Sequence, residues 1–314
     1  MPTLNYALSK NFNYFFNRIN PSPTFVQKAS SEHTTITNLI EKSWLTRELN
    51  PRCFLQGSYR RQTSIYTIND IDIVVLCQDL YVSKRRGQAS IYSQRWDRDR
   101  VFNAIASPLL NDGRYKDKVK YRKSSMCIKV DLGIKIEILP VVQKYPNSSY
   151  NIEPFCLYRP ENKQWEDGYA RYHQQHLTDK NRGTGNFIPA IKVFKHLRHY
   201  HQIKSVSFHI ECLLLSLPGE LFQGNSATYI TNILHFIAKD SAKSWYDLKI
   251  ITPCGERYLF TDNEWSWESW KNFHHHVQSW SCLAQEATRA LSKELAIYYW
   301  QELLGKEYFP KEVS

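Results

Sequence analysis

The chain has 314 residues, which is enough to bury a large core and predicts one or two domains. Its apolar content of 42% is ordinary for a globular protein, and no apolar run approaches the roughly 20 residues of a membrane helix. The formal net charge of +11 indicates an anionic partner, either nucleotides or nucleic acid, unless it serves only a soluble basic surface.

The N-terminal segment predicts two helices and no secretory signal. A charged stretch followed by an apolar one is absent there, and the seven cysteines include no Cys-x-x-Cys pair, which favours thiols in a reducing cytoplasm. Apolar spacing predicts one helix over 4–19 and another from Ser22-Pro23 to about Leu49. Both helices are expected to pack behind the sheet that the following strands form.

The stretch from Phe54 to Leu76 carries the clearest chemistry. Gly57-Ser58 ends a short apolar run, and Asp70-Ile71-Asp72 opens a β-branched run. Side chains alternate along a strand, so Asp70 and Asp72 project to the same side, about 7 Å apart. Such a pair usually has a cation between its groups, and hard oxygen ligands suit magnesium. Glycine lets backbone approach closely, and amides at a helix start can face a phosphate.

Two basic stretches follow, on either side of an amphipathic helix expected over 91–110. The first is Lys84-Arg85-Arg86, and the second runs from Lys116 to Lys123 with Tyr115 and Tyr121 nearby. Alternating lysines such as Lys118 and Lys120 would form a stripe on one side of a strand. Basic residues near aromatic ones are typical of nucleic-acid binding, so an activating RNA or DNA is a hypothesis beside a plain solvated face.

The rest of the chain predicts two more strands and then helices. Residues 125–132 and 134–142 are expected to be strands joined at Gly133, and 143–163 a long connection. This places a catalytic core in 1–160 and a helical half in 161–314. Helices are expected at 187–200, 205–217, 228–238 and 265–303. The last should bury Ala287, Leu291, Leu295 and Tyr298. Three successive histidines, 274–276, point in different directions on a helix and do not predict zinc.

Gly57-Ser58 followed by Asp70-x-Asp72 resembles the nucleotidyltransferase superfamily centred on DNA polymerase β. The two motifs Gln-Gly-Ser-Tyr-Arg-Arg-x-Thr and Asp-Ile-Asp-Ile-Val-Val are similar to those of the bacterial cGAS/DncV-like nucleotidyltransferases, which make cyclic oligonucleotide signals. The ending Gly-Lys-Glu-Tyr-Phe-Pro310 is similar as well. The resemblance implies an α+β fold, with a polymerase-β-like mixed sheet, N-terminal helices, a C-terminal α-helical lobe, and NTPs in the cleft between.

The resemblance also implies roles for single residues. Ile134-Lys-Ile-Glu-Ile-Leu-Pro140 is similar to the strand that carries the third catalytic carboxylate, which makes it Glu137 although the family usually has aspartate there; Asp131 is the rival. By the same resemblance Lys195 and Ser207 contact the triphosphate, and the alternative for Ser207 is a plain N-cap. The complete nucleotide-binding set expected is Gln56, Gly57, Ser58, Thr63, Lys195 and Ser207.

The activity implied is the joining of NTPs into a cyclic di- or trinucleotide, with release of pyrophosphate. Asp70, Asp72 and Glu137 would hold two Mg²⁺ ions, with Mn²⁺ as a substitute. A downstream effector would sense the product in cytoplasmic antiphage signalling of the CBASS type. Three alternatives stay open: a template-independent polymerase making linear product, a protein-modifying nucleotidyltransferase, and a catalytically inactive nucleotide- or RNA-binding module.

Overall fold

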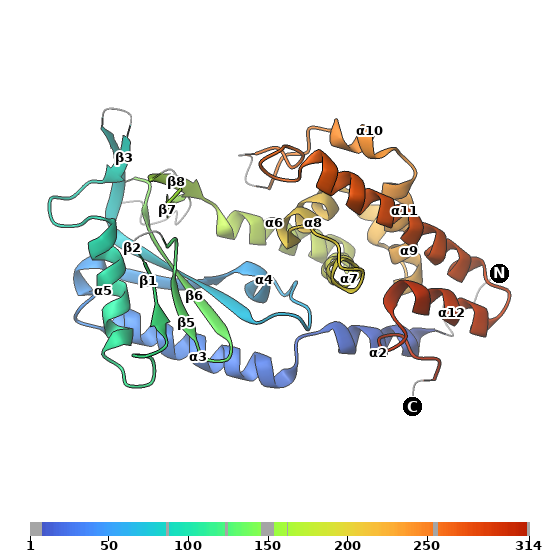
Figure 1. The fold of residues 1–314 in the computed structure, drawn as a ribbon, viewed down its shortest axis with the longest axis horizontal. Coiled ribbons are helices and arrows are strands. Elements are labelled where there is room, and N and C mark those ends of the chain that lie inside the picture. Colours follow the sequence, from blue (N-terminus) through green and yellow to red (C-terminus); the bar gives the residue numbers. More distant parts are fainter. Residues whose placement is uncertain are drawn as a thin grey trace. The chain divides into compact units, whose positions relative to one another are not determined.

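A computed structural model describes residues 8–85, 88–122, 125–145, 154–161, 163–253 and 257–312 (Figure 1). The chain divides into two compact units. One, called here the sheet unit, comprises Pro21–Gln62 and Thr67–Tyr172. The other, called the helical unit, comprises Met1–Asn20, Thr63–Tyr66 and His173–Ser314. The boundary thus falls at 172/173, beyond the expected position near residue 160, and the chain crosses between the units more than once.

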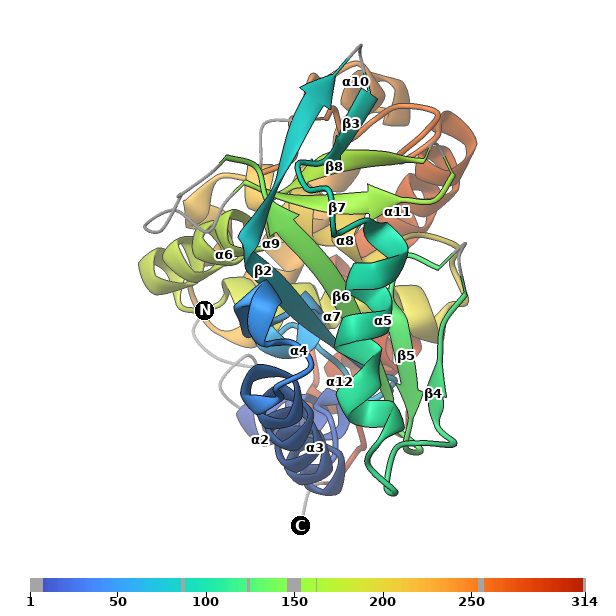
Figure 2. The ribbon, with the colours of Figure 1, turned by 90° about the vertical axis from the view of Figure 1, so that its left-hand side faces the viewer.

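The sheet unit is built on one mixed sheet. Its central strands are parallel, and the other pairings are antiparallel. Among the described residues the strand order is β1-β2-β6-β5-β4, with β7 beside β6, β8 beside β7, and β3 beside the far end of β2 (Figure 2). The strands are β1 Pro51–Gln56, β2 Asp70–Arg85, β3 Gln88–Ile91, β4 Val119–Lys120, β5 Ile128–Asp131, β6 Lys135–Gln143, β7 Phe155–Arg159 and β8 Gln164–Gly168.

Two helices cover one face of this sheet. They are α3 (Pro23–Lys42) and α5 (Arg98–Leu110), and the short 3-10 helix η1 (Arg47–Leu49) follows α3. Their apolar side chains share a core with alternate residues of the central strands, among them Ile73, Val75, Ile136 and Ile138. We call this the back face. The alternation of β2 and β6 therefore turns the intervening residues, including Asp70 and Asp72, to the opposite, front face.

The front face is polar at one end of β2 and apolar at the other. Further along β2 and β6, Val74, Leu76, Leu139 and Val141 form a small cluster with Phe155 and Leu157 of β7. Ala170, the first residue of α6 (Ala170–Thr184), packs against this cluster. The apolar cluster anchors the strands, and the carboxylates lie at the strand starts beyond it.

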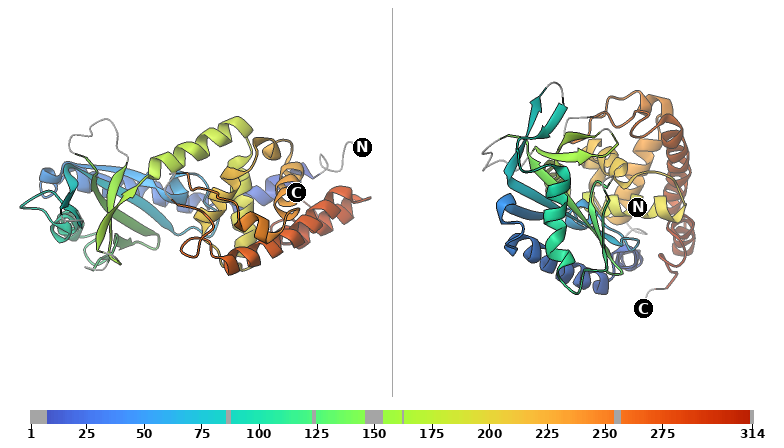
Figure 3. Two further views of the ribbon diagram at one scale, coloured as in Figure 1. Left: turned by 90° about the horizontal axis from the view of Figure 1, so that it is seen from above. Right: turned by 60° about the vertical axis from the view of Figure 1, so that its left-hand side comes forward.

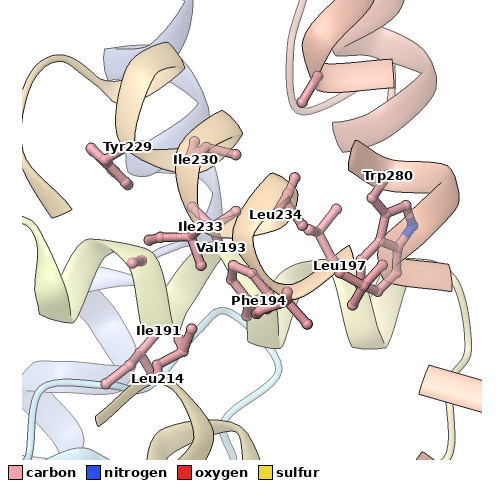
Figure 4. Close-up of a cluster of buried hydrophobic side chains, with 14 of the residues drawn as sticks. Ile191, Val193, Phe194, Leu197, Leu214, Tyr229, Ile230, Ile233, Leu234 and Trp280 are labelled. Atoms are coloured by element: carbon pink, nitrogen blue, oxygen red, sulfur yellow. The ribbon is translucent and has the colours of Figure 1, made fainter. Parts of the chain in front are cut away.

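The helical unit packs its helices around one large aromatic core. Figure 4 shows α7, α8, α9 and α11 contributing Phe194, Leu214, Ile233 and Trp280 to this core, and Figure 3 gives two further views of these helices. The elements of this unit are α2 Ser9–Ile19, α7 Phe187–Tyr200, α8 Ser207–Ser216, η2 Gly219–Phe222, α9 Ser226–Ala238, α10 Ala242–Tyr246, α11 Trp267–Arg289 and α12 Lys293–Leu304, with most of α6.

The N-terminal helices differ from the expectation in their packing. Helix α3 begins as predicted, since the Ser22 hydroxyl accepts a hydrogen bond from the Phe25 amide and Pro23 lies in the first turn. It packs on the sheet. Phe12 and Phe15 of α2 are buried in the core of the helical unit. The apolar stripe of α2 was read correctly, but a stripe does not specify which core it joins.

Three further boundaries differ. The helix expected over 91–110 begins only at Arg98, where Asp97 caps it. The connection at 143–163 contains β7, and its residues 146–153 lie outside the described part. The helix expected over 265–303 is two helices, because Ala290 is extended and Ser292 caps α12. This break changes the helical phase, so Leu291, Leu295 and Tyr298 are exposed rather than buried. No helix in the described ranges is both long and apolar enough to cross a membrane.

Candidate active site

The two aspartates of β2 and Glu137 of β6 lie on the same face of the sheet. Asp72 is in direct register with Glu137 across the parallel pair β2–β6, and Asp70 is in register with Lys135. Residues in register on neighbouring strands project to the same side. The sheet therefore brings together the three carboxylates that the sequence singled out, on the front face and at the start of the central strands.

Gly57 allows the backbone to approach this cluster closely. It begins α4 (Gly57–Arg60) with a φ of +74°, a conformation that L side chains rarely adopt. A Cβ atom at this position would lie 1.8 Å from Asp72 Oδ2. Both the positive φ and the lack of space for a Cβ atom therefore require glycine at this position. The turn with Gly57 and Ser58 lies beside the Asp72 carboxylate, and Gln56, immediately before it, is in register with Asp72 across β1–β2.

The surroundings of Asp72 strongly affect its ionisation. Burial, followed by the negative charges of Asp70 and Glu137, raises the pKa of Asp72 to about 6, against an opposing effect of Arg61. Burial and like charge both penalise the ionised form. A cation bound among these groups would relieve the penalty, which is the electrostatic condition expected of a metal-binding carboxylate cluster.

Glu137 and its rival Asp131 have different partners. Glu137 accepts a hydrogen bond from Lys129 Nζ at 2.7 Å, so a lysine partly balances its charge. Asp131 is exposed, is in register with Lys135 rather than with an aspartate, and accepts a hydrogen bond from the Gly133 amide at 3.1 Å. Glu137 is adjacent to Asp72, whereas Asp131 stabilises the turn before β6. This geometry favours Glu137 as the third carboxylate.

The donor set suits a hard divalent cation. Asp70, Asp72 and Glu137 offer only carboxylate oxygens, which are the ligands that Mg²⁺ and Mn²⁺ prefer. In the described part of the chain, no three acidic, histidine or cysteine side chains converge as a ready metal cage, and Glu137 is turned toward Lys129. The raised pKa of Asp72 is the observation that fits a cation, since burial and then the neighbouring negative charges disfavour its ionised form.

Lys195 occupies a different environment from the one expected. Its side chain is 4% exposed, and its Nζ donates to Glu211 Oε1 at 2.7 Å, to Thr63 Oγ1 at 2.9 Å and to the Thr63 carbonyl at 3.1 Å. The other oxygen of Glu211 is 2.9 Å from His173 Nε2. An ammonium group has three N–H bonds, and protein atoms accept all three here. The structure therefore shows a buried ion pair where a phosphate contact of Lys195 was expected.

Ser207 is not the N-cap residue that was the alternative to a triphosphate contact. It is the first residue of α8, but Val206 is the N-cap residue and makes no side-chain cap. The Ser207 hydroxyl instead accepts a hydrogen bond from Arg198 at 3.1 Å. Thr63, Lys195 and Ser207 all belong to the helical unit, whereas Gln56, Gly57 and Ser58 belong to the sheet unit with the carboxylates.

Sequence reasoning missed the partners of these groups. Glu211 lies in the helix expected over 205–217 but was assigned no contact, and the signal for it was a glutamate inside an otherwise apolar helix. Lys129 alternates with the buried Ile128 and Val130, so its position on the front face could have been read from the strand pattern. Nothing in the sequence around His173 indicates that it contacts Glu211.

Comparison with known proteins assigns nearly the whole chain. Residues 7–181 match the model of the Second Messenger Oligonucleotide or Dinucleotide Synthetase domain. Residues 175–281 match that of the cGAS/DncV-like nucleotidyltransferase C-terminal helical domain. The match of the first model extends over all three carboxylates and the Gly57-Ser58 turn.

Individual relatives are distant but extensive. The cyclic UMP-AMP synthase of Rhodothermus marinus is 24% identical over 242 residues, which cover 71% of this chain and 82% of that protein. The cyclic AMP-AMP-AMP synthase of an Acinetobacter species is 23% identical over 312 residues, 94% of this chain and 83% of that protein. The solved structure of the Rhodothermus marinus CdnE c-UMP-AMP synthase with Apcpp and Upnpp superimposes with a TM-score of 0.66 at 20% identity, covering 86% and 94% of the two chains. The chain therefore belongs to the second messenger oligonucleotide or dinucleotide synthetases, the cGAS/DncV-like nucleotidyltransferases.

Proposed function

We propose that this nucleotidyltransferase joins NTPs into a cyclic di- or trinucleotide in a metal-dependent reaction. The observation that carries the proposal is the placement of Asp70, Asp72 and Glu137 on one sheet face beside the Gly57 turn. The relatives named above are cyclic nucleotide synthases, which supports the same class of product.

In this reaction the protein forms no covalent bond to the nucleotides. A hydroxyl oxygen of the acceptor nucleotide forms a bond to the α-phosphorus of the donor, pyrophosphate leaves, and the hydroxyl proton passes to solvent. Asp70, Asp72 and Glu137 would hold two Mg²⁺ ions. When bound, the ions neutralise charge on the α-phosphate and pyrophosphate and lower the pKa of the attacking hydroxyl. Gly57 and Ser58 would hold the donor phosphates against Asp72.

Lys195 has a different part in this proposal from the one expected. Because its N–H bonds are directed to Thr63 and Glu211, it holds Thr63 in place rather than a phosphate. Thr63 follows closely after Gly57-Ser58 in the chain. We therefore assign the nucleotide contacts to Gln56, Gly57 and Ser58, with Ser207 as a remaining candidate.

The test is incubation with all four labelled NTPs and MgCl₂, followed by phosphatase treatment and mass spectrometry. Cyclic products have no terminal phosphate and resist phosphatase, so resistant di- or trinucleotides support the proposal. Products that phosphatase degrades would identify a linear polymerase, the second candidate. An absence of any product, with NTP binding retained, would identify an inactive nucleotide-binding module. The Asp72→Asn variant controls for contaminating activity.

We further propose that the product signals to a downstream effector in antiphage defence. The support is the family itself, whose name describes second messengers. Phage challenge of cells that carry the complete native locus, with wild type or Asp72→Asn protein, tests this. Protection by the wild type and its loss in the variant is expected, and equal plating of phage on both strains would contradict it.

A further inference from the structure

Three lysines lie on the same sheet face as the carboxylates, and a fourth lies in the turn that leads into this edge of the sheet. Lys120 of β4 is in register with Lys129 of β5, and Lys129 is in register with Glu137 of β6. One position along, the Asp131 amide donates to the Lys118 carbonyl at 3.2 Å, and Asp131 is in register with Lys135. We call Lys118, Lys120, Lys129 and Lys135 the lysine stripe.

The burial of the alternate residues fixes the face. Val119 of β4 and Ile128 and Val130 of β5 pack into the back-face core with α3 and α5. Lys120 and Lys129 alternate with them and therefore project to the front face. Lys135 does the same beside Asp70, whereas Lys118 lies in the turn before β4 and is held at this edge by its backbone hydrogen bond to Asp131. Two rows of residues result, listed from the sheet edge inward: Lys120, Lys129, Glu137, Asp72 and then Lys118, Asp131, Lys135, Asp70, the place of Lys118 being set by its backbone alone.

Most of this positive charge is not balanced within the sheet unit. Lys129 pairs with Glu137. Lys118, Lys120 and Lys135 are exposed, and in the ranges that the structure describes none of them forms an ion pair. With strands about 4.8 Å apart, Lys120 lies three strands, or roughly 14 Å, from Asp72. An extended nucleotide with its 5′-phosphates covers a comparable length.

We propose that the lysine stripe binds the 5′-triphosphate of the acceptor nucleotide and of the linear intermediate that it becomes. The inference rests on the proposed function. The acceptor must present a ribose hydroxyl at the carboxylates, so its own phosphates, at the other end of the sugar, need cations elsewhere. Ammonium groups on exposed stems are suitable phosphate partners. Because these lysines share the carboxylate face, they favour a substrate over a separate nucleic-acid activator.

The lysine stripe includes part of the second basic stretch, Lys116 to Lys123, and gives it a different role from the one expected. Lys120 projects to the front face and Lys118 lies in the turn before it, whereas Lys123 lies outside the described residues, as do the side chains of Lys84, Arg85 and Arg86. The hypothesis of an activating RNA or DNA rested on these residues together. The experiment below therefore includes RNA as a competing ligand.

A single-transfer assay tests the inference. The donors are the four α-³²P-labelled 2′,3′-dideoxy-NTPs, which lack a hydroxyl and cannot act as acceptors. The acceptors are either the four α,β-methylene NTPs, which cannot act as donors, or the corresponding nucleosides. The measured quantity is kcat/KM for each acceptor class. The ratio of the two values reports how much the acceptor's phosphates contribute.

The variant is Lys118→Gln with Lys120→Gln, and the matched control is Lys42→Gln with Arg47→Gln. The control removes the same charge from exposed positions on α3 and η1, which pack on the opposite face. Wild type should prefer phosphorylated acceptors. In the stripe variant the ratio of the two kcat/KM values should fall at least about fivefold, the size expected for exposed charge contacts. In the control the ratio should stay at the wild-type value.

An unchanged preference in the stripe variant would overturn the inference, as would an equal loss in the control, which would indicate bulk charge alone. The same proteins are titrated with a fluorescent single-stranded RNA. If the stripe variant loses RNA binding while the acceptor preference is unchanged, the stripe belongs to a nucleic-acid site and the inference is wrong. If wild type transfers to no acceptor at all, the proposed function itself fails.

Discussion

Asp72 combines a catalytic position with an energetic cost to the fold. Its pKa is about 6 in the folded protein and 3.8 as the ordinary value, so between these two pH values the folded state keeps a proton that the unfolded state releases. Stability therefore falls as the pH rises through this window and stays lower above it.

Asp72→Asn should accordingly stabilise the metal-free protein at pH 7.5 by up to about 3 kcal/mol, since each pKa unit corresponds to about 1.4 kcal/mol. The same change should reduce turnover more than about 100-fold, because it removes a charge that stabilises the transition state. Urea unfolding in EDTA and pyrophosphate release measure the two effects. A variant that unfolds more easily than wild type at this pH would contradict the penalty that burial and neighbouring charges place on the ionised Asp72.

Gly57 permits a substitution test with a built-in control. In Gly57→Ala the new Cβ would meet Asp72 Oδ2 at 1.8 Å and would sit at a φ of +74°, so the turn must move away from the carboxylate. Turnover should fall at least about 100-fold. Gly113→Ala places its Cβ in open space and should leave turnover near wild type. Equal activity of the two variants would mean that the Gly57 turn is not held against Asp72 during catalysis.

At the scale of elements, α7 and α8 are joined by the buried pair of Lys195 and Glu211. Removing one partner of such a pair leaves a buried charge and typically costs about 3–5 kcal/mol. Lys195→Met should therefore lower the unfolding free energy by about this amount, rather than act only on the KM for NTP.

The double variant Lys195→Met with Glu211→Gln should be less destabilised than the sum of the two single variants, because neither charge is then left alone. Urea unfolding gives the unfolding free energies of wild type, the two single variants and the double variant. Lys293→Met, at an exposed position on α12, is the control. If Lys195→Met is as stable as wild type and has a raised KM for NTP, the result would instead support the phosphate contact that the sequence predicts for Lys195.

Sequence patterns predicted the helices and strands better than the tertiary contacts between them. The alternation at Asp70-Ile71-Asp72 was sufficient to place both carboxylates on one face, because the β-branched residues between and after them could only be buried. The helix over 187–200 was found at its observed bounds from its apolar stripe. In both cases local periodicity alone determines the result.

The failures are of the kind that local pattern cannot resolve. The apolar residues Leu291 and Leu295 continue the spacing of α11, and only the extended Ala290 turns them outward. A lysine among apolar residues reads as a surface group, and the burial of Lys195 depends on Glu211 and Thr63, distant in sequence. Tertiary partners decide such positions.

At the scale of the whole molecule, buried histidines make the fold sensitive to acid. Burial lowers the pKa of His196 to about 4, and burial also lowers the pKa of His209, His274 and His276. For a base with a lowered pKa, the contribution to stability is complete above the ordinary value of 6.5 and is lost as the pH falls toward 4.

Asp72 acts in the opposite direction over the same range, but it is one group against four histidines, so the unfolding free energy should show a net decrease from pH 6.5 to pH 4. His196→Gln should show a shallower decrease, since the amide can still donate to the Leu304 carbonyl but does not titrate. Thermal or urea unfolding across this range measures the slope. Identical slopes for wild type and variant would show that His196 protonation does not contribute to acid unfolding.

The central claim is that Asp70, Asp72 and Glu137 form one catalytic centre on the front face of the sheet. The most direct measurement is pyrophosphate release by Glu137→Gln and Asp131→Asn, beside wild type, with matched folding by circular dichroism. Glu137 adjoins Asp72 in register, whereas Asp131 accepts a hydrogen bond from the Gly133 amide. We predict a loss of more than about 100-fold for Glu137→Gln and near wild-type rates for Asp131→Asn. An active Glu137→Gln with an inactive Asp131→Asn would contradict the account.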